Sequence, residues 1–226
     1  MQTDADHNRI LKKIANEILK PNGLFQKGTS RVWIDDNGWF LIIVEFQPSA
    51  WSKGAYLNVG IHYLWDDKDS LTFDYGHRFH SFVSFDGNEE KIAADMESLA
   101  ELAVNQVVQY RRFRDLEYAR VSILQNKAHH VIRTLYSKMM ICGLNKNMDA
   151  VNYCRQLMEA IPLYSELAWT GKYLLELQDR IAPIIDDQEL FYRYICDKVN
   201  SQRNYWRSKS SMKKLKETFT VEFADS

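Results

Sequence analysis

The stretch "RVWIDDNGWFLIIVEFQPSAWSKGAYLNVGIHYLW", residues 31–65, decides the fold because it holds consecutive strands and the turn that joins them. Asn37-Gly38 separates two β-prone runs, and both residues tolerate the positive φ of a tight hairpin turn. We therefore predict a β-hairpin with strands at about residues 31–36 and 39–46.

Two more strands follow along the chain. Residues 55–65 alternate large apolar side chains with Tyr, Asn, Gly and His, as expected when successive side chains point to opposite faces of a strand. Residues 71–85 alternate in the same way. Short connections between strands predict an antiparallel meander with one apolar and one wet face. An amphipathic helix at residues 8–20 is expected to cover the apolar face.

The character of the sequence changes to helical after residue 88. A long helix is predicted to run towards residue 114, and helical spacing and terminating residues predict further helices near 116–141, 147–161, 164–181, 187–200 and 208–218. The fold class is therefore α+β. We divide it into residues 1–118, a helix and antiparallel-sheet domain closed by the long helix, and residues 119–226, an all-helical extension of antiparallel hairpins. Packing of both parts as one unit is the alternative.

The composition is that of a soluble globular protein, with 46% hydrophobic and 26% charged residues among 226. Lys plus Arg, at 29, nearly balances Asp plus Glu, at 30, so no overall field favours nucleic acid or an anionic membrane. Because the N-terminal residues are polar and no apolar run approaches the length of a membrane span, we expect neither a signal peptide nor a span, and the three widely spaced cysteines suit a reducing compartment. We expect a cytoplasmic protein. The oligomeric state is not indicated.

Part of the chain resembles a known family. The run from residue 18, "ILKPNGLFQKGTSRVWIDDNGWFLIIVEFQPSAWSKGAYLNVGIHYL", is similar to the bacterial domain-of-unknown-function family 4304, with the pattern covering about residues 10–85. Gln26 and Pro48 depart from the usual text of the family. The resemblance implies a helix followed by an antiparallel sheet in a bacterial protein, with no agreed activity. It also suggests an immunity or interaction protein of a toxin system.

The polar face of the predicted sheet carries one candidate ligand site. Asn58, His62, Arg78 and His80 would project together from neighbouring strands if the register is that of a plain meander. Arg offers a planar fork and His a further donor, so this group could hold a carboxylate or a phosphate. A solvated face with scattered polar groups is the commoner interpretation.

Trp51 lies in a loop between Pro48 and Gly54. A large aromatic residue there either folds back on the core, which is the commoner outcome, or anchors a partner protein. Gln47 and Ser49 could hold the loop backbone through side-chain hydrogen bonds. Gln47, Ser49 and Trp51 therefore form the candidate partner-binding site.

The segment "RNYWRSKSSMKKLK", residues 203–216, is the clearest local excess of positive charge. Its cations could neutralise phosphates while its aromatic residues stack on bases. The candidate nucleic-acid-binding residues are Arg203, Tyr205, Trp206, Arg207, Lys209, Lys213 and Lys214. Because Met212, Leu215 and Phe219 recur at helical spacing, a terminal helix docked by its apolar side is the favoured alternative.

Sequence motifs of catalysis are absent from the chain: it has no GxSxG, no HExxH and no glycine-rich phosphate loop. No cofactor and no metal site are expected. The first functional hypothesis is a non-catalytic module that binds another protein. A nucleic-acid-associated protein and a small-ligand binder or enzyme at the polar sheet face are the alternatives.

Overall fold

The computed structural model describes residues 4–126 and 130–220, and the chain forms two compact units. Unit 1 consists of Met1–Leu64, Lys68–Arg111 and Arg203–Thr218, and unit 2 of Trp65–Asp67, Arg112–Gln202 and Phe219–Ser226. The predicted α+β class with an antiparallel sheet is confirmed. The division differs from the predicted one at residue 118, because a C-terminal segment belongs to the unit that contains the sheet. Residues 1–3, 127–129 and 221–226 of the predicted domains lie outside the described residues.

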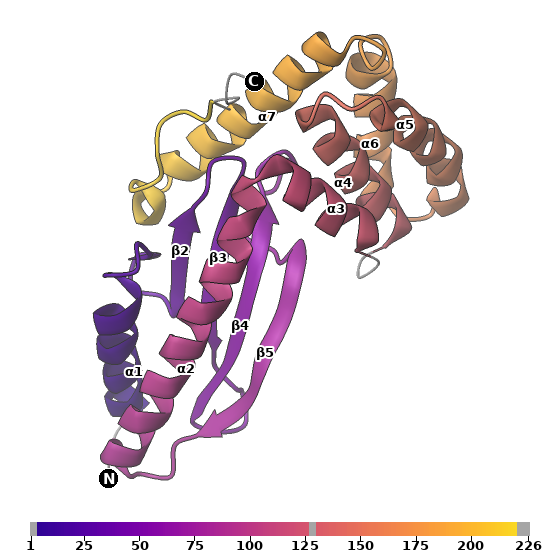
Figure 1. Cartoon of the computed structure of the whole chain (residues 1–226). Coiled ribbons are helices and arrows are strands. Elements are labelled where there is room, and N and C mark those ends of the chain that lie inside the picture. Colours follow the sequence, from indigo (N-terminus) through magenta and orange to yellow (C-terminus); the bar gives the residue numbers. More distant parts are fainter. Residues whose placement is uncertain (1–3, 127–129, 221–226) are drawn as a thin grey trace. The chain divides into compact units, whose positions relative to one another are not determined.

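The described part of unit 1 contains a five-stranded antiparallel sheet in the order β1-β2-β3-β4-β5 (Figure 1). The predicted hairpin is confirmed: Asp36 pairs with Leu41, and Gly38 takes a φ of 82° in the turn. A two-residue first strand was not predicted, because so short a strand leaves no periodic pattern. The strands are β1 Phe25–Gln26, β2 Val32–Asp36, β3 Phe40–Gln47, β4 Gly54–Tyr63 and β5 Tyr75–Ser84.

Helices α1 (Asp4–Leu19) and α2 (Glu89–Arg111) pack against each other, and α2 crosses one face of the sheet (Figure 1). The Trp33 indole N–H of β2 donates to the Asn16 side-chain oxygen of α1, at 3.1 Å. The face carries the alternate apolar residues that the sequence indicates, and burying each side chain contributes about 1.5–3 kcal/mol. Its buried residues include Trp33, Val44, Phe46, Leu57, Val59 and Ile61.

The opposite face of the sheet, called the second face below, is not simply wet as predicted. Its residues Ile34, Leu41 and Ile43 are also buried. Trp206, from the C-terminal segment of unit 1, lies edge-on to the His62 ring of β4 with the ring centroids 5.9 Å apart. The second face is therefore partly covered by a segment more than a hundred residues away in the sequence.

The pairing of β4 with β5 departs from the plain meander that the sequence suggested. Asn58 pairs with Arg78 and Gly60 with Gly76, but Leu57 pairs with His80. Phe79 is therefore an extra residue of β5, a β-bulge. A second irregularity in the pairing lies between Leu57 and Ala55 of β4. Alternation in the sequence could not show these insertions, because residues within a bulge keep the same composition as the strand.

Unit 2 is helical in its described residues. The predicted helix near 116–141 is two helices, α3 and α4, and residues 127–129 between them lie outside the described residues. The predicted helix near 208–218 is only a 3₁₀ turn, η4 Ser210–Met212, which belongs to unit 1. The remaining elements are η1 Arg112–Arg114, α3 Leu116–Gln125, α4 Val131–Leu144, α5 Asp149–Ala160, η2 Ile161–Tyr164, α6 Thr170–Glu176, the π-helical turn η3 Leu177–Ile181 and α7 Gln188–Ser208, of which the last six residues belong to unit 1.

None of the described helices combines the length and the apolar character that a membrane span requires. The cysteines are free thiols: Cys142 and Cys154 are buried and Cys196 is half-buried. Burial raises the pKa of the Cys142 thiol to about 11. This thiol therefore has little nucleophilic thiolate at neutral pH.

Candidate functional site

Trp51 is 94% exposed, so the expectation that it folds back on the core is wrong. It lies in the connection between β3 and β4, residues 48–53, called the Trp51 loop below. The Ser49 hydroxyl accepts a hydrogen bond from the Trp51 backbone N–H at 3.1 Å, as predicted. The backbone N–H of Phe85 donates to the Lys53 carbonyl at 2.9 Å. The loop backbone is thus held while the indole lies in solvent.

Gly54 shows why the loop leaves the sheet at this point. It takes a φ of 139°, and a Cβ there would lie 2.0 Å from the Val83 carbonyl oxygen. Only glycine tolerates both this backbone conformation and this close approach of β5. The exit of the loop into β4 is therefore fixed by the backbone itself.

Arg31 lies beside the Trp51 loop and was not singled out from the sequence. Its guanidinium donates to the Asn8 side-chain oxygen at 2.6 Å and to the Gly54 carbonyl at 3.0 Å, and one nitrogen lies 3.0 Å from His7 Nε2. These acceptors are uncharged if His7 is neutral, and within the described chain no carboxylate pairs with Arg31. Burial lowers the pKa of Arg31, although a guanidinium remains charged at neutral pH.

A shallow pocket of about 310 Å³ joins Arg31 to the Trp51 loop. Its lining contains the cations Arg31 and Lys53 together with His7, and none of its lining residues is Asp or Glu. An arginine before a strand gives no local sign of this role, because its partners come from α1 and from β4. The sequence therefore pointed to Trp51 as a candidate but gave no sign of the cation beside it.

Gln47 holds a polar cluster on the second face and not the loop backbone as predicted. Its side-chain oxygen accepts from Asn58 Nδ2 and from Arg78, both at 2.9 Å. Asn58 Nδ2 also donates to Glu45 Oε2 at 2.9 Å, and the Arg78 guanidinium lies 3.9 Å from the Tyr56 ring centroid. Two of the four predicted ligand-binding residues, Asn58 and Arg78, are thus brought together.

His62 and His80 do not join Asn58 and Arg78. His62 is fully buried, with Nδ1 3.3 Å from the Thr72 hydroxyl and 3.7 Å from an Asp74 carboxylate oxygen. The bulge places His80 opposite Leu57, where its exposed ring lies beside the Ser81 carbonyl. The predicted four-residue anion site is therefore not assembled in this geometry.

The basic C-terminal segment is largely engaged inside unit 1. Arg203 is completely buried and bonded to Asp36, Trp206 is 4% exposed, and Arg207 pairs with Glu217 at 2.9 Å. The Lys209 ammonium lies 4.4 Å from the ring centroid of Tyr205. Lys213 and Lys214 are exposed. The buried indole of Trp206 cannot stack on a base without leaving the core.

The alternative of a docked terminal segment is confirmed for its apolar residues, since Met212, Leu215 and Phe219 are all buried. The segment docks as a 3₁₀ turn followed by irregular chain and not as an α-helix. Arg203 contributes to this docking through its bond to the Lys216 carbonyl, at 2.8 Å.

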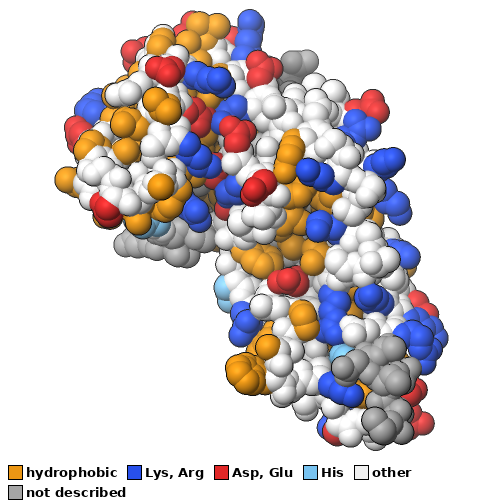
Figure 2. Space-filling model, turned by 180° about the vertical axis from the view of Figure 1, so that it is seen from behind, with side chains coloured by type: hydrophobic (Ala, Val, Ile, Leu, Met, Phe, Trp, Pro, Cys, Tyr) orange, Lys and Arg blue, Asp and Glu red, His pale blue; other side chains and the backbone are white. Residues whose placement is uncertain are grey.

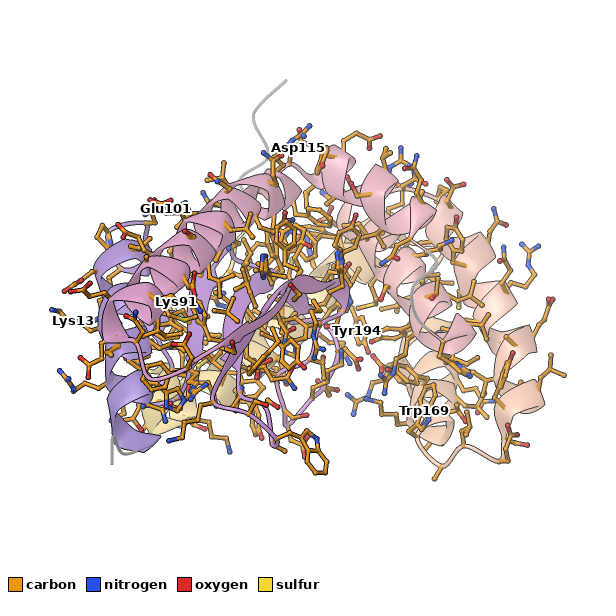
Figure 3. The ribbon with its side chains drawn as sticks, turned by 90° about the horizontal axis from the view of Figure 1, so that it is seen from below. Lys13, Lys91, Glu101, Asp115, Trp169 and Tyr194 are labelled. Atoms are coloured by element: carbon orange, nitrogen blue, oxygen red, sulfur yellow. The ribbon has the colours of Figure 1, made fainter. Side chains whose placement is uncertain are left out.

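Unit 2 contains a polar cluster that the sequence did not reveal. One carboxylate oxygen of Glu176 accepts from the Tyr136 hydroxyl at 3.0 Å, from the Tyr194 hydroxyl at 2.6 Å and from Lys198 at 2.6 Å (Tyr194 is labelled in Figure 3). The pKa of Tyr136 is raised well above that of a free phenol. Burial is the larger cause, and the negative charge of Glu176 is the next. Asp66 accepts from Lys172 and Tyr173 in the same way. These partners satisfy one another, so the cluster is a structural network.

The described residues contain no group of three or more His, Cys, Asp or Glu side chains arranged to hold a metal ion. Comparison of the chain with protein-family models, with curated proteins and with solved structures finds no match in any of the three. The resemblance of residues 10–85 to family 4304 therefore stays a prediction.

Proposed function

We propose that the protein is a non-catalytic module that binds another protein through the Trp51 loop. The observation that carries the proposal is the 94% exposure of the Trp51 indole on a loop whose backbone is held by hydrogen bonds. An exposed Trp gives up contact with the core, and Trp is among the residues that contribute most to binding at interfaces. A held loop also loses less conformational entropy on binding than a free one.

The neighbouring charges indicate the chemistry of the partner. Arg31 is half-buried and has no carboxylate partner in the described chain, and Lys53 lies in the same pocket lining. A partner surface with an apolar recess for the indole and a carboxylate at its rim would match both features. The charged hydrogen bond to Arg31 would then form in a partly desolvated place, where it is stronger than in water.

The test begins with capture of partners from lysate by the wild-type chain and by Trp51→Ala, with and without nuclease. A candidate partner is then purified, and its dissociation constant is measured for wild type, Trp51→Ala and Arg31→Gln. Loss of a central indole is expected to weaken binding by about thirtyfold, the equivalent of about 2 kcal/mol. Val108→Ala is the matched control, because Val108 is another exposed apolar residue of unit 1, 50% exposed on α2. Equal affinity of wild type and Trp51→Ala for every captured protein would refute the proposal.

Nucleic-acid binding and small-ligand binding at the predicted four-residue site receive less support from the structure. Nucleic-acid binding by residues 203–214 would have to rely on the exposed lysines, because Arg203 and Trp206 are buried. Small-ligand binding by Asn58, His62, Arg78 and His80 loses two of its members to burial and to the bulge. The second face nevertheless carries a different hollow.

A further inference from the structure

The second face of the sheet contains a pocket of about 380 Å³ within unit 1. Its apolar lining comes from three separate segments of the chain and consists of Val32, Ile43, Leu71, Phe73 and Trp206. Figure 2 views the molecule from this side and shows hydrophobic side chains gathered over the sheet, bordered by charged ones. A hollow with aromatic and aliphatic walls and a few polar groups is the usual form of a small-molecule site.

Gly60 permits the position of the Phe73 wall. A Cβ on Gly60 would lie 2.4 Å from Phe73 Cδ1 and 2.7 Å from the Tyr75 carbonyl oxygen. The Phe73 ring is thus seated directly on the backbone of β4, as is typical where glycine interrupts a strand. This close contact leaves no room for a Cβ at position 60.

The charges in the pocket lining are Lys27, Glu45 and Asp69. None of the three forms an ion pair within the described part of the chain. Glu45 is half-buried, and the buried Asn58 amide donates to its Oε2 atom, so its carboxylate is oriented while Oε1 accepts no hydrogen bond from a described residue. Two carboxylates against one ammonium make the lining net negative.

Besides Glu45 Oε1, Trp206 carries a second polar group of the lining, its indole N–H, that lacks a hydrogen-bond partner among the described residues. Its ring lines the pocket, it is 4% exposed, and its indole N–H has no acceptor among the described residues. Buried donors in proteins are nearly always paired, so an unpaired donor in a pocket wall calls for an explanation. The π-face of a bound aromatic group would supply a weak acceptor for this N–H after a small adjustment of the ring.

We propose that this pocket binds a small molecule with an aromatic or branched apolar body and a primary ammonium group. The body would lie against Ile43, Phe73 and Trp206, and the ammonium would donate to the oriented Glu45 carboxylate. Asp69 would add attraction at the rim. The proposal is independent of the Trp51 loop, because no residue of that loop lines this pocket.

The experiment titrates the full chain with tryptamine and with phenethylamine, and with indolepropionate as the matched anion. The readout is the indole N–H resonance of Trp206 in ¹H–¹⁵N spectra, assigned with Trp206→Phe, together with calorimetric dissociation constants. We expect both amines to shift this resonance at millimolar concentration and the anion to leave it unchanged. Trp51→Ala should bind the amines as the wild type does.

Variants locate the ammonium. Glu45→Gln keeps an acceptor for Asn58 but removes the charge, and it should weaken amine binding by about tenfold, as expected for the loss of a charged hydrogen bond. Glu101→Gln is the matched control, because Glu101 is exposed on α2 and is labelled there in Figure 3. Unfolding curves check that both variants are folded.

Three outcomes would overturn the proposal. The first is no shift of the Trp206 resonance by either amine up to about 5 mM, a concentration that detects even millimolar affinity. The second is equal binding of the amines and the anion. The third is equal weakening by Glu45→Gln and by Glu101→Gln, which would mean that the amines respond only to net charge.

Discussion

Arg203 and Asp36, which are 167 residues apart in the sequence, form a two-point ion pair. One guanidinium nitrogen lies 2.8 Å from Oδ1 and another lies 2.7 Å from Oδ2 of the carboxylate. Arg203 is fully buried and also bonds the carbonyls of Gly38 and Lys216. The pair therefore joins the β2–β3 hairpin to the C-terminal segment inside unit 1.

Removing Arg203 should strongly destabilise unit 1. Arg203→Ala leaves Asp36 as a buried carboxylate without its cation, and breaking a buried pair in this way costs about 3–5 kcal/mol. Urea unfolding followed by tryptophan fluorescence measures the loss. Arg207→Ala is the matched control, because its partner Glu217 is exposed and a surface pair contributes about 1 kcal/mol or less. A loss equal to that of Arg207→Ala would contradict the role given to Arg203.

The same pair predicts a pH dependence. Burial opposes ionisation of Asp36, but hydrogen bonds and the charge of Arg203 outweigh it, so the pKa of Asp36 is lowered on folding. A lowered folded-state pKa adds stability above the ordinary pKa of an aspartate, and that stability is lost as the pH falls through the folded-state value. Free energies of unfolding between about pH 6 and about pH 2 should therefore fall more for the wild type than for Asp36→Asn. Parallel curves would show that the pair does not set the acid response.

Trp51 should be dispensable for folding. Its side chain is 94% exposed, and surface substitutions away from special features usually change stability by less than about 0.5 kcal/mol. Trp51→Ala should thus unfold at the urea concentration of the wild type while losing partner binding. Phe46→Ala, which empties a buried position in the neighbouring strand, should cost about 3–5 kcal/mol. A Trp51→Ala chain that unfolds early would indicate that the indole packs on the protein in solution.

Glu176 should control the ionisation of two tyrosines in unit 2. Burial is the largest cause of the raised pKa values of Tyr194 and Tyr136, and the negative charge of Glu176 and its hydrogen bonds raise them further. Glu176→Gln should therefore let these phenols ionise at lower pH, which spectroscopic titration of tyrosinate measures. It should also cost about 1–3 kcal/mol of stability, because Lys198 and two hydroxyls lose a charged acceptor. Glu166→Gln, at an exposed position of the same unit, is the control.

The basic segment should bind nucleic acid only weakly and without stacking. Because Trp206 is buried, single-stranded oligonucleotides should leave its fluorescence unchanged, and any affinity should disappear at physiological salt. Polarisation of a labelled oligonucleotide measures this for the wild type and for Lys213→Glu/Lys214→Glu. Tight binding at physiological salt that the double variant abolishes would restore the nucleic-acid hypothesis.

Local patterns in the sequence predicted the strands and the long helix well. Asn37-Gly38 located the hairpin, and alternation located β4, because turn chemistry and burial act on neighbouring residues. The break between α3 and α4 was missed, since helical spacing continues on both sides of it. For Trp51 the sequence favoured packing on the core over exposure, and the exposed position was the less expected of the two. The composition of the loop could not decide between them.

The candidate sites depended on features that a linear pattern cannot contain. The bulge at Phe79 removed His80 from the predicted polar group, because a one-residue shift reverses the face of the side chains that follow it, here as far as the second irregularity. Trp206 reached the second face only through the return of the chain to the sheet. Long-range contacts of this kind leave no trace in local spacing, so the pocket beside Glu45 could not have been anticipated.

The return of residues 203–218 to the sheet also bears on biosynthesis. A ribosome makes the five strands first, but Trp206, which lies on the second face, and Arg203, which pairs with Asp36 across 167 residues of sequence, emerge much later. Closing so long a loop is entropically costly and slow, and an incomplete sheet exposes apolar surface in the meantime. The nascent chain should therefore depend on chaperones until residues 203–218 have emerged, and termination before residue 203 should yield aggregates even though the whole sheet has been synthesised.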